Sequence, residues 1–259
     1  MPRYAYLGPS GTFTEAALRT LPDAAQAELV PCATIEAALE AVRLGAADVA
    51  VVPIESSVDG AVTATLDELA TGGELLIRGE VLLPIEFALL ARPDVELGGI
   101  AAVGGHPQAQ AQCRRWLAGN LPDAQWRPAA SNAMAAQQVA SGELDAALAG
   151  SFAATGYGLA VLADNVHDHA GAVTRFVVVG GPGPLPAATG ADRTSLAAFL
   201  VEDHPGVLMQ LLTEFAVRGI NLSRIESRPT GDELGKYYFC IDCEGHIDDA
   251  RVGEALMGL

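Results

Sequence analysis

Short apolar runs alternate with longer stretches in which alanine and leucine recur at helical spacing through the first 180 residues. This alternation is typical of an α/β fold built on a mainly parallel sheet. Helices are predicted at Ile35–Arg43 and Asn132–Ala140. Strands are predicted at Tyr4–Leu7, Asp48–Ile54, Phe87–Ala91, Ile100–Val103, Asp145–Ala149 and Arg175–Val179.

A weak internal repeat suggests that this region has two similar lobes. The segment 41–48 resembles 138–145, and both contain Val-x-x-Gly-x-x-Asp before an apolar run. In each copy we expect a helix to end at the glycine and the aspartate to precede a strand. Chance similarity in an alanine-rich chain is the alternative.

A Pro/Gly-rich segment, Gly180–Gly190, follows the last of these strands and suits neither a helix nor a strand interior. It divides the chain into a domain at 1–180, a linker at 181–193 and a domain at 194–259. In the second domain we predict a ferredoxin-like βαββα order that lacks its last strand, so we expect the chain to be shortened at its C-terminus. The predicted elements are a strand at Ser195–Val201, a turn at His204–Gly206, a helix at Val207–Val217, strands at Ile220–Arg228 and Lys236–Glu244, and a helix at Asp248–Leu259.

Composition narrows the possible partners and compartment. The 259 residues carry a formal charge of −17, which disfavours nucleic acid and anionic membranes as partners. The chain has neither a signal peptide nor an apolar run long enough to span a bilayer, so we expect a cytoplasmic protein. Its four scattered cysteines are expected to be thiols.

Two polar segments follow predicted strands, where open α/β sheets usually bind ligands. In Gly8–Glu15, Thr12 and Glu15 form a capping box that begins a helix, and Ser10 and Gly11 precede it. This turn is either a site for a carboxylate or phosphate group or a capped helix without a ligand. In Pro53–Gly60, Ser56 and Ser57 are candidate hydrogen-bond donors, whereas Asp59 is a candidate helix cap.

A third polar segment contains His106, Gln108 and Gln112, with the two glutamines one helical turn apart. Both amides are candidates for a cleft, although surface glutamines are common on helices. Thr174 and Arg175 pair a neutral donor with a fixed cation at the start of a strand. Thr174 and Phe176 are expected to share one face of that strand and Arg175 the other.

Metal binding is not expected. His167-Asp168-His169 lacks a third ligand at a recognisable spacing. Cys240 and Cys243 lie three residues apart on a predicted strand and should face opposite sides, which disfavours a shared metal or a disulfide.

Taken together, these motifs occur in the order found in prephenate dehydratases, which the chain resembles over essentially its whole length. The motifs are Gly8–Glu15, Pro53–Gly60, Gly105–Gln108 with Gln112-Cys113, Thr174–Phe176, and, past the linker, His204–Leu208 and Glu226–Pro229, which resemble the amino-acid-binding motifs of an ACT domain. The resemblance implies a bilobal periplasmic-binding-protein-like (type 2) catalytic domain plus an ACT domain. It also implies decarboxylating dehydration of prephenate to phenylpyruvate without a cofactor, feedback by phenylalanine, and a homodimer or homotetramer.

The resemblance also assigns roles to individual residues. Those implied to be catalytic are Thr174, Gln112 and Glu55; those expected to bind substrate are Ser10, Gly11, Thr12, Ser56, Ser57, His106, Arg175 and Phe176; those expected to bind phenylalanine are Gly206, Val207, Leu208, Asn221, Leu222 and Ser227. Two positions depart from the family pattern, because Ser56 replaces the usual Asn and Gly105 a frequent Ser. Arogenate dehydratase and a non-catalytic, amino-acid-responsive binding protein are the alternatives.

Overall fold

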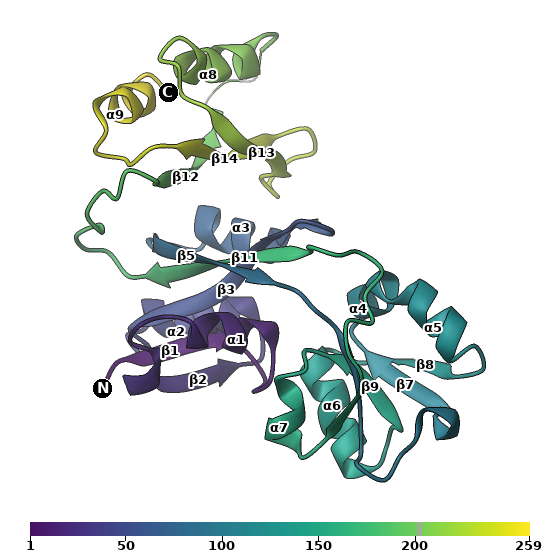
Figure 1. Cartoon of the computed structure of the whole chain (residues 1–259). Helices are drawn as coiled ribbons and strands as arrows, with labels where there is room; N and C mark the ends of the chain where they lie inside the picture. The colour runs from purple at the N-terminus through teal and green to yellow at the C-terminus, as the bar shows by residue number, and fades with distance from the viewer. Residues whose placement is uncertain (201, 203) are drawn as a thin grey trace. The chain divides into compact units, whose positions relative to one another are not determined.

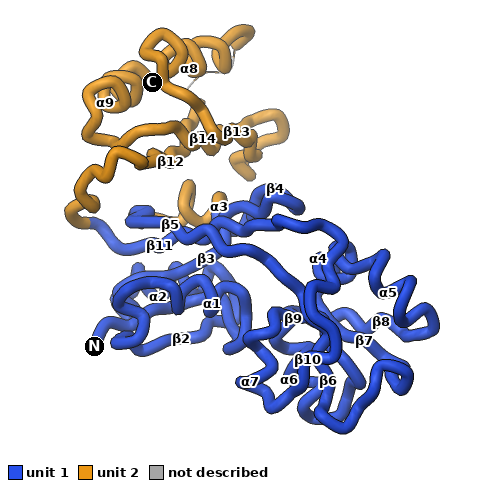
Figure 2. The backbone as a smooth tube through the Cα atoms, in the orientation of Figure 1, with its two compact units in different colours: residues 1–65, 74–182 blue, residues 66–73, 183–259 orange. Residues whose placement is uncertain are grey.

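The computed structural model describes residues 1–200, 202 and 204–259, and the chain forms two compact units (Figure 2). Unit 1 comprises Met1–Thr65 and Glu74–Pro182, and unit 2 comprises Leu66–Gly73 and Gly183–Leu259. Residues 66–73 were expected in the first domain, so their grouping with the C-terminal residues was not predicted.

The first lobe of unit 1 contains a six-stranded sheet in the order β2-β1-β3-β11-β5, with β4 paired to β3 (Figure 1). Helices α1 (Phe13–Arg19) and α2 (Ile35–Arg43) pack against it. Its core includes Tyr6, Leu18 and Val51. The strands are β1 Arg3–Leu7, β2 Glu28–Cys32, β3 Val49–Ser56, β4 Gly60–Ala61, β5 Leu76–Pro84 and β11 Val173–Gly180.

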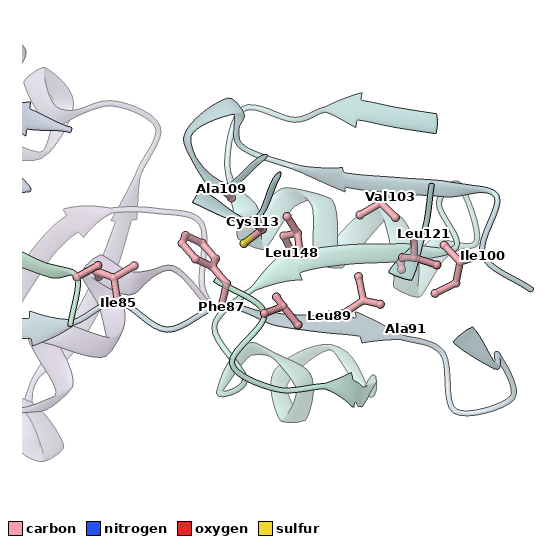
Figure 3. Close-up of a cluster of buried hydrophobic side chains, with 13 residues drawn as sticks. Ile85, Phe87, Leu89, Ala91, Ile100, Val103, Ala109, Cys113, Leu121 and Leu148 are labelled. Carbon is pink, nitrogen blue, oxygen red and sulfur yellow. The ribbon is translucent and has the colours of Figure 1, made fainter. Parts of the chain in front are cut away.

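The second lobe contains a five-stranded sheet in the order β10-β6-β9-β7-β8. Its apolar core, drawn in Figure 3, gathers Leu89, Leu148 and Cys113 from β6, β9 and the end of α4. The strands are β6 Ala88–Ala91, β7 Ala102–Gly105, β8 Gln125–Pro128, β9 Ala146–Ala149 and β10 Ala160–Ala163, and the helices are α4 Pro107–Gln112, α5 Arg114–Asn120, α6 Asn132–Ser141 and α7 Ala153–Tyr157.

The α/β class is confirmed, but the sheets are mixed rather than mainly parallel. In the first lobe β1 is parallel to β2 and β3, whereas β11 is antiparallel to both β3 and β5. The chain leaves this lobe along β5 and returns along β11, and the Ile85 N–H donates to the Ala172 carbonyl at 2.8 Å where the two connections meet. Because the returning strand enters from the end at which β5 leaves, it runs opposite to its neighbours.

The internal repeat corresponds to the same local structure in each lobe. Gly45 follows α2 and Gly142 ends α6, and both have positive φ, which favours glycine. The Asp48 carboxylate accepts the Arg3 N–H at 2.7 Å, and the Asp145 carboxylate accepts the N–H of Ala102 at 2.9 Å. Each aspartate therefore ties the start of its strand to the parallel strand beside it.

Unit 2 has a three-stranded antiparallel sheet in the order β12-β14-β13. Helices α8 (Val207–Ala216) and α9 (Ala250–Met257) pack on it through a core that includes Phe215, Ile241 and Val252. The strands are β12 Arg193–Phe199, β13 Leu222–Pro229 and β14 Tyr237–Glu244. The predicted strand at Ser195–Val201 thus lies on β12, except that Val201 is outside the described residues.

The segment 66–73, most of which lies in α3 (Thr63–Thr71), makes polar contacts within unit 2. The Asp67 carboxylate accepts two hydrogen bonds from Arg228, at 2.9 and 2.7 Å, and one from the Tyr238 hydroxyl at 2.6 Å. Arg228 lies in the Glu226–Pro229 motif, so this motif takes part in a contact with α3. Within the described part of the chain, no helix is long and apolar enough to cross a membrane.

Candidate active site

The turn after β3 is bound to the beginning of β11, which brings two of the predicted motifs together. Thr174 is the register partner of Ser56. The Ser57 hydroxyl accepts the Val173 N–H at 2.9 Å, and the Ser57 N–H donates to the Val173 carbonyl at 2.9 Å. Ser56 Oγ accepts the N–H of Asp59 at 3.2 Å, so it shapes the turn itself. The two serines therefore hold this turn beside Thr174.

Arg175 lies on β11 between two carboxylates of its own sheet. The guanidinium is buried, at 4% exposed, and its Nε donates to Glu80 Oε2 at 2.7 Å. Its NH1 lies 3.9 Å from Glu55 Oε2, and Glu55 is its register partner on β3. A buried cation without counter-charges is costly, so these carboxylates stabilise Arg175 in place. Glu55 and Arg175 thus form a cross-strand pair directly beside the pair of Thr174 and Ser56 along the two strands.

Phe176 lies in the core of the first lobe and not at the surface of the site. It is 2% exposed and packs with Tyr6 and Val51. Apolar rings on a strand between two others are usually buried in this way. Since solvent does not reach the ring, we leave Phe176 out of the proposed substrate site.

The turn before α1 uses its polar groups on a buried carboxylate. Glu15, 5% exposed, accepts the Ser10 hydroxyl at 2.7 Å and the Gly11 N–H at 2.5 Å, and Arg19 Nε donates to it at 2.8 Å. Burial opposes ionisation, but these three partners outweigh it and hold the pKa of Glu15 below its ordinary value. Thr12 accepts the Glu15 N–H as predicted, whereas the Glu15 carboxylate reaches Gly11 instead of Thr12.

The same turn contacts the second lobe. The Tyr157 hydroxyl donates to the Ser10 carbonyl at 2.5 Å. The Phe13 ring packs edge-on against Phe87 and Phe152, with centroid distances of 5.5 and 5.3 Å. Gly11 has φ +86°, and a Cβ there would lie 2.9 Å from the Tyr157 ring, so both backbone and space require glycine. Gly8–Glu15 is therefore part of the contact between lobes.

Helix α4 contributes one polar side chain from the second lobe to the turn after β3. Gln112 is 6% exposed, and its Nε2 donates to Asp59 Oδ2 at 2.9 Å. Its Oε1 is buried and has no hydrogen-bond partner among the described residues. Gln108 is exposed, so only one of the two predicted amides lies inside.

His106 is the N-cap of α4. Its Nδ1 accepts the Gln108 N–H at 3.3 Å, and its own N–H donates to Asn132 Oδ1 at 2.8 Å. Nδ1 is therefore the acceptor that caps the first turn of α4. The contacts of His106 therefore account for it as a turn residue.

Gly105, one of the two departures from the family pattern, is packed against an aromatic ring. A Cβ at this position would lie 2.8 Å from Trp126 Cη2 and 3.5 Å from Leu148 Cβ. The space that a serine side chain would occupy here is therefore filled by the indole ring of Trp126 and is not empty.

Asp168, the middle residue of the His-Asp-His sequence, binds backbone groups. Asp168 accepts the N–H groups of Arg115 and Trp116 at the start of α5, at 2.8 and 3.2 Å. Among the residues that the structure describes, no group of three or more His, Cys, Asp or Glu side chains is arranged to hold a metal ion. Cys240 and Cys243 are free thiols.

The residues expected to bind phenylalanine lie on unit 2. Gly206 has φ +94° and precedes Val207 and Leu208 in the first turn of α8. Asn221 donates to Glu244 Oε1 at 2.8 Å just before Leu222 opens β13. Ser227 lies later on β13, opposite Phe239. Gly206, Asn221 and Ser227 are exposed, so their polar groups are accessible in a single chain.

The comparisons with known proteins are consistent over the whole chain. Residues 4–183 match the family profile "Prephenate dehydratase", and residues 195–259 match "ACT domain". Prephenate dehydratase of Mycobacterium tuberculosis is 52% identical over 266 residues, which cover 99% of this chain and 82% of that protein.

Two solved structures extend the comparison. Prephenate dehydratase from Arthrobacter aurescens in complex with L-Phe is 53% identical, has a TM-score of 0.93, and matches over 99% of this chain and 85% of that one. A protein described as a novel type of quorum quenching acylase is 29% identical, with a TM-score of 0.85, over 99% of this chain and 92% of that one. A shared fold therefore accommodates more than one chemistry, and the site has to carry the assignment.

Proposed function

Since the chain belongs to the prephenate dehydratase family, we propose that unit 1 converts prephenate into phenylpyruvate with Thr174 as the residue that assists the leaving hydroxyl. The enzyme is a carbon–oxygen lyase, and residues 195–259 form an ACT domain. The four cysteines are free, which supports a reducing compartment, the cytoplasm, as its location.

The chemistry asks for orientation more than for a strong base. The prephenate dianion loses CO₂ from its ring carboxylate, the bonding electrons form the aromatic ring, and hydroxide leaves from C4, giving the phenylpyruvate anion. Aromatisation supplies the driving force. The protein has to align the departing groups and offer a hydrogen bond to the leaving oxygen. The hydroxide is then neutralised to water by a proton from the buffered solvent.

The observation that carries the proposal is the register of β11 on β3. It sets Thr174 opposite Ser56. Ser56 accepts the N–H of Asp59 in the turn that follows, and Asp59 accepts a hydrogen bond from Gln112 of the other lobe. Three of the motifs thereby converge on one place. Thr174 supplies a neutral donor, and a threonine hydroxyl is too weak an acid to give up its proton fully, so its role is a positioned hydrogen bond.

Substitution of Thr174 tests this role. Thr174→Ala should lower kcat by on the order of 10²–10³-fold, as expected for loss of one donor to developing negative charge. Thr174→Ser keeps the hydroxyl and should retain most of the activity. Phenylpyruvate formation from prephenate is the assay, and near-wild-type turnover by Thr174→Ala contradicts the assignment.

Glu55 is proposed to orient the substrate hydroxyl from its place beside Arg175. Its ion pair with Arg175 is long, 3.9 Å, and Glu55 is part-exposed, so the carboxylate is accessible to a ligand. Glu55→Gln with an unchanged pH–rate profile would remove Glu55 from the mechanism.

We propose further that phenylalanine binds between two copies of unit 2, in a homodimer or homotetramer, and lowers turnover. Gly206–Leu208, Asn221 and Ser227 are the expected contacts. A ligand bound there changes catalysis to the extent that it favours one of two conformations of the enzyme. Titration of the full chain with phenylalanine in a calorimeter, with turnover measured in parallel, tests both statements, and absence of binding heat refutes them.

Arogenate is the alternative substrate, because it differs from prephenate only by an amine in place of the side-chain keto group. Parallel measurement of kcat/KM for the two compounds decides between them. Release of CO₂ from either one excludes a purely binding role.

A further inference from the structure

We propose that Asp59 is a positioning residue that sets the orientation of the Gln112 amide, so that Gln112 Oε1 accepts a hydrogen bond from the C4 hydroxyl of the substrate. This inference rests on the proposed function and adds a residue to its site. Asp59 acts only through Gln112. The sequence motif alone presented Asp59 as a helix cap.

The direction of the hydrogen bond fixes which end of the amide is free. An ionised carboxylate only accepts hydrogen bonds, so the group that faces Asp59 Oδ2 at 2.9 Å has to be the amide nitrogen of Gln112. The amide oxygen consequently points away from Asp59. Without a charged acceptor on one side, the two ends of a glutamine amide are nearly equivalent in shape.

The free oxygen lacks a partner in a place where that is costly. Gln112 is 94% buried, since 6% of its surface is exposed, and Oε1 has no hydrogen-bond partner among the described residues. A buried acceptor without a partner costs about 1–3 kcal/mol, so such groups are usually found where a ligand or water completes them. Gln112 Oε1 is therefore poised to accept a donor.

Prephenate has one donor at neutral pH. Both carboxylates are ionised and the side-chain keto oxygen only accepts, which leaves the C4 hydroxyl as the group that matches Oε1. When that hydroxyl donates to Gln112, the lone pairs of its oxygen are directed elsewhere and remain available to the Thr174 hydroxyl. The acceptor and the donor together define the orientation of the leaving group.

The fold keeps Asp59 in place for this role. Ser56 Oγ accepts the Asp59 N–H, and the neighbouring Ser57 is bound to Val173 by two hydrogen bonds. Gln112 is the last residue of α4, and its carbonyl accepts the Asp168 N–H at 2.6 Å. Both partners are thus held by backbone hydrogen bonds on their own lobes.

The test compares Asp59→Ala and Asp59→Asn by kcat and KM for prephenate, with Asp123→Ala as the matched control. Asp123 is an exposed aspartate on a loop of unit 1, so the Asp123→Ala substitution removes the same charge as Asp59→Ala. Misplacement of one orienting group costs on the order of 10²-fold, so Asp59→Ala should lower kcat by that factor. Asp59→Asn keeps a hydrogen bond but lets the amide turn over, so kcat should fall while KM changes little. Full activity of Asp59→Asn overturns the orienting role, because a mere latch between lobes tolerates either amide orientation.

A double-mutant cycle tests whether Asp59 acts through Gln112. If Asp59 acts through Gln112, Asp59→Ala should change kcat of the Gln112→Ala enzyme by no more than about twofold. The exchange Asp59→Asn with Gln112→Glu restores a donor–acceptor pair and a free carboxylate oxygen, so it should be more active than Gln112→Glu alone. Multiplicative losses in the cycle overturn the proposal. A wild-type enzyme without turnover of prephenate refutes the proposed function instead.

Discussion

Replacement of Gly105 by serine, the residue frequent at this position in the family, should destabilise the second lobe. Gly105 lies on β7, and a Cβ there would be 2.8 Å from Trp126 Cη2 and 3.4 Å from Asn132 Oδ1. Carbon atoms do not approach to 2.8 Å, so the indole ring or the strand has to move.

The size of the effect follows from two opposing contributions. Overpacking a well-packed core typically costs about 1–3 kcal/mol. Replacing a glycine inside a strand recovers roughly 0.5–1 kcal/mol, because the unfolded chain loses conformational freedom. The net loss in the free energy of unfolding is therefore about 1 kcal/mol, with roughly 2.5 kcal/mol as an upper limit. With a urea m-value of about 2 kcal/mol/M, the midpoint moves down by roughly 0.5 M.

Tryptophan fluorescence is the suitable assay, because both tryptophans of the chain, Trp116 and Trp126, pack against the core of this lobe. The signal thus reports this lobe and not unit 2. In a Trp126→Phe background the clashing edge of the ring is gone, so Gly105→Ser should cost less, with Trp116 as the remaining reporter. An unchanged midpoint for Gly105→Ser, or equal losses in both backgrounds, refutes the argument from packing.

Two further predictions concern ionisable groups. The hydrogen bonds from Arg228, which outweigh burial, and the one from the Tyr238 hydroxyl hold the pKa of Asp67 below its ordinary value. The ionised carboxylate therefore stabilises the folded protein above the unfolded pKa. This stabilisation is lost as the pH falls through the lower folded pKa. Stability of unit 2, followed by hydrogen exchange, should decrease in acid with a smaller pH dependence in Asp67→Asn, and identical dependence in the two proteins contradicts the pairing. The effect will be small, because the Asp67 side chain is 42% exposed. Burial, reinforced by the charge of Asp168, raises the pKa of the Cys113 thiol to about 12. Cys113 should therefore resist alkylation at pH 8 in the folded protein and react in urea, which peptide mass spectrometry can measure. Rapid labelling of the folded protein would contradict this.

The parts of the fold that depend on near neighbours in the chain were predictable from the sequence. Helix Ile35–Arg43 has the predicted bounds, and Thr12 caps α1 as expected. The two glycines after helices α2 and α6 adopt the left-handed conformation that the repeat implied. These features depend on hydrogen bonds and steric limits within a few residues, so the local pattern contains the necessary information.

The parts decided by the tertiary structure involve residues far apart in the chain. Gln112 and Asp59 are separated by 53 residues, and only the folding of two lobes onto each other makes them partners. The sequence predicts Glu15 as half of a capping box, but in the fold its buried carboxylate accepts hydrogen bonds from Gly11, Ser10 and Arg19.

The sequence by itself determined the α/β class and the motifs that suggest the chemistry. It did not determine that Phe176 packs in the core, that residues 66–73 belong with unit 2, or that β11 runs antiparallel to its neighbours. Strand direction and long-range pairing follow from the path of the chain between lobes, because backbone hydrogen bonds and buried charges take whichever partners that path brings near.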